Sequence, residues 1–491
     1  MKTWKKALLS TLALLSGSAL VACSSLQGNN SQTAEKTNDG MTPILLYQIG
    51  EPPKNFDVLM ENANKIIEKE TGAHLDIKYI NWGDYGDRMA IMTASGENYD
   101  IAFAHNYVLN AQKGAYADLT DLYKKEGKAL YDILDPAYIK GNMVNGKIYA
   151  VPVIGNVANQ QMFSFNKDLV DKYKLDISTV KTYEDLEPLL AVIKEKEPTI
   201  TPMAYTKGTK VSDNFDYILG DLLPFVVDLE GDPTKIVNQF EVEHYKKHLR
   251  TVHKYYQAGY IPADVATSDV EFNLATPNWF VRKETQGPAD FGDSLLSTVA
   301  GYSIVSRPLT NAYKTSGSTQ AANFVISSTS KNKEKAMEVL TLINTNKELL
   351  NGLVFGPEGT NWEHDPNDEN RIKLLDGYAN DTRMAAWNTG NSQLLYLSDK
   401  VSEVDVAQAQ SVLDSAVESP ALGFSFDTEP VKTEITRLQN IMNQYNASIH
   451  TGTVDPDTAI PKLMDLLHSE EAYQKVMDEM QKQYDAFLAQ K

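Results

Sequence analysis

The chain has 491 residues, of which 65 are acidic and 46 are lysine or arginine, so its formal net charge is −19. So acidic a surface repels the phosphate backbone of nucleic acids and anionic lipid headgroups, and no nucleic-acid partner is expected. The single cysteine excludes an intrachain disulfide, and a chain of this length is expected to form two lobes or more rather than one core.

Residues 1–22 have the pattern of a secretory signal peptide. Three lysines precede the mostly apolar stretch 7–20, which is shorter than the roughly 20 residues that a membrane-spanning helix needs. Leu20-Val21-Ala22-Cys23 then resembles the lipobox of bacterial lipoproteins, L-x-[AG]-C. An incidental thiol at Cys23 is the alternative. The resemblance implies cleavage before Cys23 and a lipid anchor on its thiol.

Residues 23–41 are expected to comprise lipidated Cys23 and a flexible tether. The stretch SSLQGNNSQTAEKTNDG contains one large apolar side chain, Leu26, and cannot bury enough surface to fold. No later apolar run is long enough to cross a bilayer. We therefore expect the folded body on the extracellular face of the cytoplasmic membrane, held there by lipid.

From residue 42 to residue 104 the sequence alternates between strand and helix patterns. Strands are predicted at 43–49, 75–79 and 99–104, and helices at 56–67 and 84–95. This alternation predicts a parallel sheet, in which ligands bind beyond the carboxyl ends of the strands. The residues expected at that rim are Tyr47, Gln48, Asn81, Trp82, His105, Asn106 and Tyr107.

The rest of the chain mixes both patterns and ends in helices. Strands are predicted at 147–153 and 161–165, and Thr182 with Asp185 has the spacing of a helix capping box. Apolar stripes at helical spacing occupy 245–256, 431–445 and 472–484. Stripes of this kind belong to the core of a soluble domain.

Several short motifs resemble segments shared by extracellular solute-binding proteins of ABC importers. They are NGKIYAVP (145–152), FNKDL (165–169), KTYEDL (181–186) and FVISSTSKNKEKA (324–336). Phe165 and Tyr183 stand where the family usually has Tyr and Trp. FGPEG (355–359), WNTGN (387–391) and GFSF (423–426) are similar to a Gram-positive lipoprotein subfamily with a helical carboxyl-terminal region. The likeness extends over nearly the whole mature chain.

This resemblance implies an α/β fold of the two-lobed, periplasmic-binding-protein-like type II, with a mixed sheet in each lobe. Lobe 1 is expected to comprise 42–155 and 317–360, and lobe 2 is expected to comprise 156–316 and 361–491 with the carboxyl-terminal helices. The chain is expected to cross between lobes near 155–156, near 316–319 and after Gly359. The lobes are expected to close on a ligand about this hinge.

The tryptophans favour a carbohydrate ligand, and the length of the chain favours an oligosaccharide. Of five tryptophans, all but Trp4 lie beyond the signal peptide, and each of those four has an asparagine neighbour. Sugars offer apolar faces edged by hydroxyls, which match aromatic rings flanked by amides. The alternative is that these tryptophans pack in cores and the asparagines stand in turns. The ligand-binding candidates are Tyr47, Gln48, Trp82, Asn106, Tyr107, Asn156, Gln160, Trp279, Trp362, Trp387 and Asn388.

Other functions are less favoured by the sequence. A peptide-binding importer lipoprotein is the main alternative, because peptide clefts also use aromatic and acidic residues. A secreted glycan-active enzyme is the second, but the spacing marks no catalytic carboxylate pair, and neither G-x-S-x-G nor H-E-x-x-H occurs. No cofactor or metal site is expected, since the eight histidines lack ligand spacing. The expected partners are a permease and its ATPase, and the protein is expected to be a monomer.

Overall fold

The computed structural model describes residues 40–155, 157–221, 223–268, 270–288 and 292–491. The predicted signal peptide 1–22, Cys23, the tether up to residue 39 and Asn156 lie outside these residues. Among the described residues, no helix combines the length and apolar character needed to cross a membrane. The described chain folds around two large apolar cores, which define the two lobes used below.

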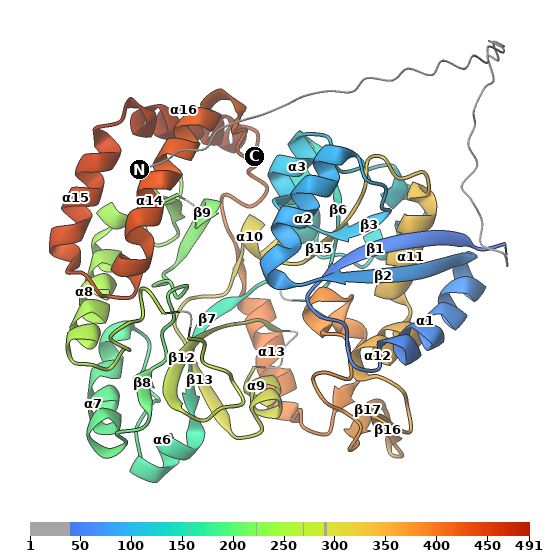
Figure 1. Ribbon diagram of the computed structural model, residues 1–491, viewed down its shortest axis with the longest axis horizontal. Coiled ribbons are helices and arrows are strands. Elements are labelled where there is room, and N and C mark those ends of the chain that lie inside the picture. The colour runs from blue at the N-terminus through green and yellow to red at the C-terminus, as the bar shows by residue number, and fades with distance from the viewer. Residues whose placement is uncertain (1–39, 156, 222, 269, 289–291) are drawn as a thin grey trace, which may run out of the picture. The chain divides into compact units, whose positions relative to one another are not determined.

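The first lobe is built around a five-stranded mixed sheet. Its strands are β1 (Thr42–Ile49), β2 (Ala73–Ile80), β3 (Ile101–Phe103), β6 (Ala150–Pro152) and β15 (Asn323–Ile326), and its main helices are α1 (Phe56–Thr71), α2 (Trp82–Ser95), α3 (Tyr107–Gln112), α5 (Pro136–Gly141), α11 (Lys333–Thr345) and α12 (Lys347–Phe355). The strand order is β2-β1-β3-β15-β6. As predicted, β1 pairs in parallel with β2 and β3, whereas β15 is antiparallel to its two neighbours. The three parallel strands therefore end at one edge (Figure 1).

Local sequence explains the first elements of this lobe. In α1 the residues Leu59, Ala63 and Ile67 are buried at helical spacing, and Gly72 ends the helix in the left-handed conformation that glycine adopts without strain. In β2 the buried and exposed side chains alternate, as expected for a strand with one face on the core. Each predicted element between residues 42 and 104 is confirmed, with boundaries that differ by a few residues.

The second lobe contains two smaller sheets, of order β13-β7-β12-β8 and β11-β10-β9. Its strands are β7 (Gln160–Asn166), β8 (Thr201–Met203), β9 (Phe215–Asp221), β10 (Phe225–Asp228), β11 (Ile236–Asn238), β12 (Trp279–Gln286) and β13 (Ile304–Pro308), and its helices include α6 (Lys167–Tyr173), α7 (Glu187–Lys196), α8 (Glu243–Gln257) and α9 (Asp293–Ala300). The predicted capping box is present, because the Asp185 carboxylate accepts a hydrogen bond from the backbone N–H of Thr182 at 2.9 Å.

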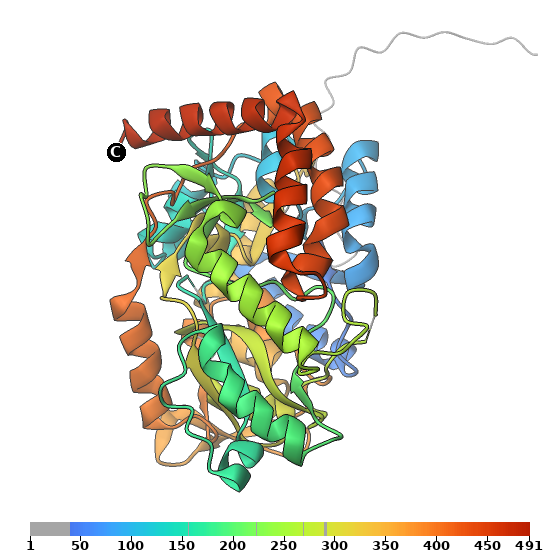
Figure 2. The same ribbon diagram turned by 90° about the vertical axis from the view of Figure 1, so that its left-hand side faces the viewer.

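Three carboxyl-terminal helices complete the second core. They are α14 (Lys432–His450), α15 (Pro456–His468) and α16 (Glu471–Leu488). They pack against one another, and α15 also packs against α8. Figure 2 shows them gathered at one end of the second lobe. Leu438, Met442, Val476, Met480 and Tyr484 are buried, so the predicted apolar stripes do serve as core.

Three segments connect the lobes, and they lie side by side. The first precedes β7, the second contains β14 (Tyr313–Lys314) and α10 (Ser316–Thr319), and the third contains β19 (Val417–Glu418). Asn159 bridges to Tyr313 in antiparallel fashion, and β14 pairs with β19 in parallel. The connection between the lobes is therefore hydrogen-bonded across all three segments.

The expected boundary at residue 361 is wrong, because the segment that follows it packs on the first lobe. Met384 belongs to the first core, and Leu394 and Leu395 pack against it. Trp362 and Ile372 form a small cluster with Phe355 at the end of α12. The third crossing, predicted after Gly359, comes at β19 instead, because these apolar side chains are buried with the first lobe.

Candidate functional site

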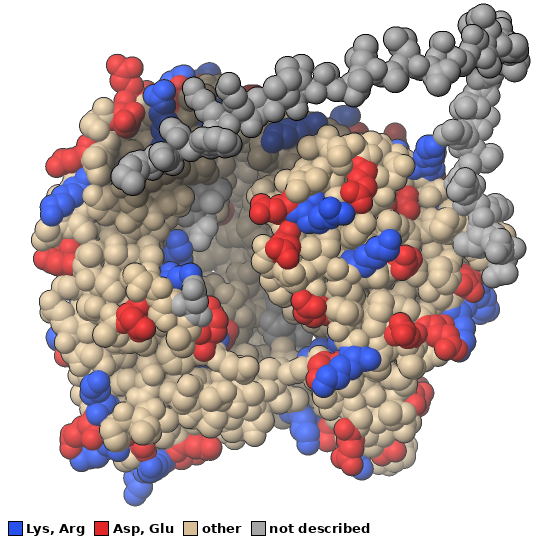
Figure 3. All heavy atoms as spheres, in the orientation of Figure 1, with Lys and Arg blue, Asp and Glu red and all other residues tan. Residues whose placement is uncertain are grey.

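A cavity of about 900 Å³ lies between the two lobes. The first lobe contributes α3, the second contributes β9, β12 and the start of α14, and α10 of the second connecting segment also lines it. The connecting segments form part of its wall through Asn159, Tyr313 and the stretch 424–428. Figure 3 shows the molecule hollowed between the two lobes. Any ligand held in this cavity would contact both lobes and the segments that join them.

Amides, hydroxyls and aromatic rings dominate the lining of this cavity. The amides are Asn106, Gln112, Asn159, Gln161, Asn214, Asn311, Gln320 and Gln439, and the aromatic residues are Tyr107, Phe215, Tyr217, Tyr313, Phe424 and Phe426. Four charged residues, Asp213, Asp216, Lys283 and Lys432, complete it with several serines and threonines. Amides both donate and accept hydrogen bonds and rings present flat apolar faces, so this set suits a neutral ligand rich in hydroxyl groups.

Two of the predicted tryptophans meet at the edge where β1, β2 and β3 end. The rings of Trp82 and Trp387 stack with centroids 5.7 Å apart and planes inclined by 25°. Trp387 also meets Phe103 edge to face at 6.0 Å. The two tryptophans remain 59% and 42% exposed. They form an exposed aromatic surface, which we call the Trp82–Trp387 platform.

Gln48 and Asn388 support this platform rather than a ligand. The Gln48 side chain is buried; its Nε2 donates to the carbonyl of Asn388 at 2.8 Å, and its Oε1 accepts from the N–H of Ile49. This amide therefore fixes the backbone next to Trp387 against the end of β1. Tyr47 is buried and packs edge to face on Tyr99. Tyr47, Gln48 and Asn388 were expected to contact ligand, but all three are buried and none lines the large cavity.

The predicted pair Asn106 and Tyr107 lies at the cavity. Asn106 precedes α3 with φ 45°, and its Nδ2 lies 2.8 Å from Nε2 of His105. Tyr107 is nearly buried, and its hydroxyl donates to the carbonyl of Asn142 at 2.6 Å. His105 in turn lies against Gly86 of α2, where an added Cβ would come within 2.9 Å of the ring. The end of β3 and the packing of His105 on α2 therefore position Asn106 at the cavity wall.

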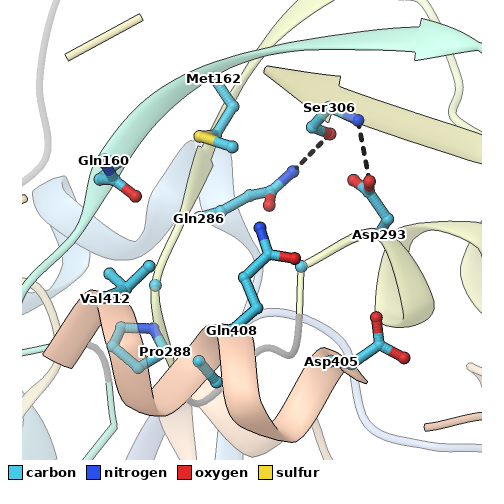
Figure 4. Close-up of a pocket in the computed structure, with 12 residues that line it drawn as sticks. Gln160, Met162, Gln286, Pro288, Asp293, Ser306, Asp405, Gln408 and Val412 are labelled. Atoms are coloured by element: carbon cyan, nitrogen blue, oxygen red, sulfur yellow. Dashed lines mark hydrogen bonds between the residues drawn. The ribbon is translucent and has the colours of Figure 1, made fainter. Parts of the chain in front are cut away.

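Gln160 lies outside the large cavity. Its Nε2 donates to the carbonyl of Thr310 at 3.0 Å, and the residue lines a separate cavity of about 50 Å³. Figure 4 shows that small cavity between Gln286, Asp293 and Ser306 of the second lobe and α13 (Glu403–Ser415). Asn156 lies outside the described residues.

Trp279 and Trp362 are core residues, which corrects their prediction as ligand contacts. Trp279 is fully buried with Ala204, Ala300 and Ile304. Trp362 is 5% exposed, and its indole N–H donates to the carbonyl of Gly356 at 2.7 Å. Residue type alone does not distinguish these two from Trp82 and Trp387, since tryptophan fills cores as readily as it lines clefts.

The cavity wall of the second lobe was not predicted. It includes Phe215 and Tyr217 of β9 and a row of polar residues along α14, namely Lys432, Thr436 and Gln439. That row has helical spacing next to the apolar stripe, and this is the signal that could have indicated it. β9 gave no comparable signal, because its residues reach the cavity only through the pairing of β9 with β10.

A buried carboxyl group borders the cavity near the third connecting segment. Burial raises the pKa of Asp216 to about 6, whereas a hydrogen bond from Ser419 lowers it. Nearby, Nζ of Lys283 donates to Oγ of Ser212 at 2.5 Å. Lys283, Lys432 and Asp213 thus have polar partners within the protein, whereas Oδ2 of buried Asp216 has none among the described residues. The amides and hydroxyls supply most of the hydrogen-bonding groups of the wall.

The comparisons with known proteins agree with this geometry. The sequence profile described as bacterial extracellular solute-binding protein matches residues 50–348, and a domain of unknown function, DUF3502, matches residues 420–489. A carbohydrate ABC transporter substrate-binding protein of Streptococcus pneumoniae is 58% identical over 495 residues, covering 100% of both chains.

Solved structures confirm the predicted α/β, two-lobed fold. The N-glycan transport solute-binding protein NgtS of S. pneumoniae aligns with a TM-score of 0.88 and 60% identity, covering 91% of this chain and 99% of that chain. The complex of NgtS with Man5GlcNAc aligns with a TM-score of 0.84. An HMO-binding solute-binding protein from Bifidobacterium longum infantis, 18% identical with a TM-score of 0.58 and covering 92% of this chain and 100% of that chain, shares the fold.

Proposed function

The chain belongs to the bacterial extracellular solute-binding protein family, and we propose that it captures an oligosaccharide built of mannose and N-acetylglucosamine for an ABC importer. Members of this family bind a substrate and hand it to a permease; they are not enzymes. The ligand of this chain and its cellular location can be tested separately.

The observation that carries the ligand assignment is the large cavity with its amide-rich wall. Its volume of about 900 Å³ is at the upper end of the 300–1,000 Å³ typical of ligand sites. Eight amide side chains line it against four charged ones. A neutral oligosaccharide satisfies amides and hydroxyls without requiring the desolvation of ligand charges. NgtS, which is 60% identical, has been crystallised with Man1GlcNAc and with Man5GlcNAc.

A peptide ligand is the alternative that the test must separate. A peptide brings charged termini, which need compensating charges within hydrogen-bonding distance. In the cavity wall, Nζ of Lys283 already donates to Ser212, and Asp216 is buried. This wall is therefore better matched to hydroxyl groups than to the charged ends of a peptide.

Isothermal titration calorimetry with Man5GlcNAc, Man1GlcNAc, a maltose oligomer and a short unblocked peptide tests the assignment. We expect one ligand per chain for Man5GlcNAc and a rise in melting temperature on saturation, because a ligand that binds only the folded form stabilises it. Mass spectrometry after incubation should recover the sugar intact. Binding of the peptide but of no sugar would overturn the proposal, and so would cleavage of the sugar.

We further propose that Cys23 carries a lipid that holds the protein at the extracellular face of the membrane. The lipobox-like Leu20-Val21-Ala22-Cys23 and the polar stretch after it support this. In cells labelled with a fatty acid, a Cys23→Ala variant should carry no label, whereas Ser24→Ala should be labelled like the unchanged protein. Persistent label on Cys23→Ala would contradict the anchor. The permease is the proposed membrane partner, and a monomer the proposed state.

A further inference from the structure

A group of metal-ligating side chains lies beside the cavity on the second lobe. Asp213 precedes β9, Glu230 follows β10, and His244 is in the first turn of α8. One possible ligand atom from each of these side chains lies within 4.8 Å of the other two. The pairing of β9 with β10 places Asp228 opposite Phe215, which brings the start of one strand and the end of the other together. The start of α8 supplies the histidine.

The ring of His244 lies between two carboxylates, one at each ring nitrogen. Its Nδ1 lies 2.7 Å from Oδ2 of Asp213, and its Nε2 lies 3.2 Å from Oδ2 of Asp228. A histidine that binds a metal through one ring nitrogen usually donates its other N–H to a carboxylate, which fixes the ring and its tautomer. Asp228 is placed to be that partner while Nδ1 faces Asp213.

Carboxylates surround His244, and its ring remains accessible to solvent. The side chains of Asp213 and Asp228 are 7% and 13% exposed, whereas that of His244 is 36% exposed. The carboxylates are therefore held in place by the fold, and the imidazole lies at an open edge. A second histidine, His248, lies 3.6 Å from the Asp213 carboxylate and 3.0 Å from Glu184, so the group is backed by a further imidazole and carboxylate.

We propose that Asp213, Glu230 and His244 bind a divalent transition-metal ion such as Zn²⁺, with Asp228 as the hydrogen-bonding partner of His244. One imidazole and two carboxylates suit zinc, whereas calcium needs six to eight oxygen ligands. Three protein ligands leave a fourth position for water.

The ion would fix one edge of the ligand cavity. Asp213 lines the cavity, and so does its neighbour Asn214. The Asn214 side chain donates to Glu230 at 2.6 Å and accepts from the N–H of Asn311 at 2.8 Å. A metal held by Asp213 and Glu230 would therefore connect the start of β9 to the turn after β10, next to the hydrogen bond from Asn214 to Glu230. This second connection would reduce the motion of the cavity wall at Asn214.

Titration calorimetry of the metal-free protein with Zn²⁺, without any sugar, tests the site. We expect one ion per chain, and at least tenfold weaker binding in His244→Ala and in Glu230→Gln. Glu230 is exposed, so its variant tests the site even if His244→Ala folds poorly. Asp228→Asn should weaken binding by about 10- to 100-fold, the usual effect of altering the partner of a ligating histidine.

A matched control and a second metal complete the experiment. His74→Gln removes a histidine that contacts Glu68 at 2.6 Å in the first lobe, and it should leave Zn²⁺ binding unchanged. Titration with Co²⁺ should produce visible absorption of a four-coordinate ion that disappears in His244→Ala. Three results would overturn the proposal: no binding of Zn²⁺, binding by His244→Ala and Glu230→Gln as tight as by the unchanged protein, or tighter binding of Ca²⁺ than of Zn²⁺. These results do not depend on which sugar the cavity takes.

Discussion

The rings of Trp82 and Trp387 stack with their centroids 5.7 Å apart, although the two residues lie far apart in the sequence. Trp82 begins α2 directly after the loop that ends β2, and Trp387 belongs to a short turn that Gln48 holds against β1. Both rings keep a large exposed face. Neither ring is among the residues that line the large cavity. Exposed stacked indoles are costly to leave in water, so we predict that a bound oligosaccharide extends from the cavity over this platform.

We predict that Trp387→Ala weakens oligosaccharide binding by about 1–3 kcal/mol, the scale of one large apolar contact. The melting temperature should change little, because the ring is 42% exposed. Calorimetry with Man5GlcNAc measures the first effect and a thermal melt the second.

Trp362→Ala is the matched comparison. This ring is 5% exposed in a small core cluster, so its loss should lower the free energy of unfolding by about 3–5 kcal/mol. If Trp387→Ala instead lowered the melting temperature as much as Trp362→Ala and left affinity unchanged, the platform would be structural.

Gly86→Ala in α2 is predicted to weaken binding several-fold without lowering stability. The added Cβ would come within 2.9 Å of the His105 ring, and His105 contacts Asn106 at the cavity wall. The ring must therefore move, while alanine favours the helix by about 0.8–1 kcal/mol over glycine. Calorimetry and a denaturant melt of the same preparation separate the two effects.

Gly352→Ala in α12 serves as control, since no atom lies within 4 Å of the added Cβ. Gly352→Ala should raise the free energy of unfolding and leave the affinity for Man5GlcNAc unchanged. Equal affinities in both variants would show that His105 and Asn106 do not act on the ligand.

Ligand is predicted to bring the two lobes together. The cavity is lined from both lobes, and a ligand that touches both favours the state in which it makes more contacts. The three paired connecting segments are positioned to bend as a unit. Small-angle scattering should show a smaller radius of gyration at saturation with Man5GlcNAc and no change with a sugar that does not bind. An unchanged radius with saturating ligand would contradict closure.

His450 is predicted to lower the free energy of unfolding as the pH falls below about 6.5. Burial, with the nearby charges of Lys210 and Lys283, lowers the pKa of His450 to about 3. Its Nδ1 accepts from the backbone N–H of Val211, so the folded protein holds the ring uncharged. Below about pH 6.5 the unfolded chain takes up a proton that the folded chain does not. The free energy of unfolding should therefore fall by up to about 1.4 kcal/mol per pH unit from this group alone as the pH decreases.

Replacement of His450 by glutamine keeps an uncharged acceptor and removes the titration. Between pH 6.5 and pH 5, the free energy of unfolding of the unchanged protein should fall by about 2 kcal/mol more than that of His450→Gln. Denaturant melts at several pH values measure this difference directly. Parallel stability curves for the two proteins over that range would contradict the prediction.

Much of this protein follows from local sequence. The strands and helices between residues 42 and 104, the capping box at Thr182 and the apolar stripes of the last helices all appear as predicted, because periodicity and caps act within a few residues. Motifs spread along the chain were enough to indicate the family. The strand–helix alternation also indicated the edge of the first sheet at which Asn106 meets the cavity.

Only the tertiary structure decided which tryptophans face solvent and which core each segment joins. Trp362 is buried and Trp387 is exposed although both have an asparagine neighbour, because burial depends on side chains that come from distant parts of the chain. The segment after Gly359 joins the first lobe through Met384 and its neighbours, and the pairing of β9 with β10 brings Asp213, Glu230 and His244 together. Contacts between residues far apart in sequence leave no local period or spacing, and so the sequence alone did not reveal them.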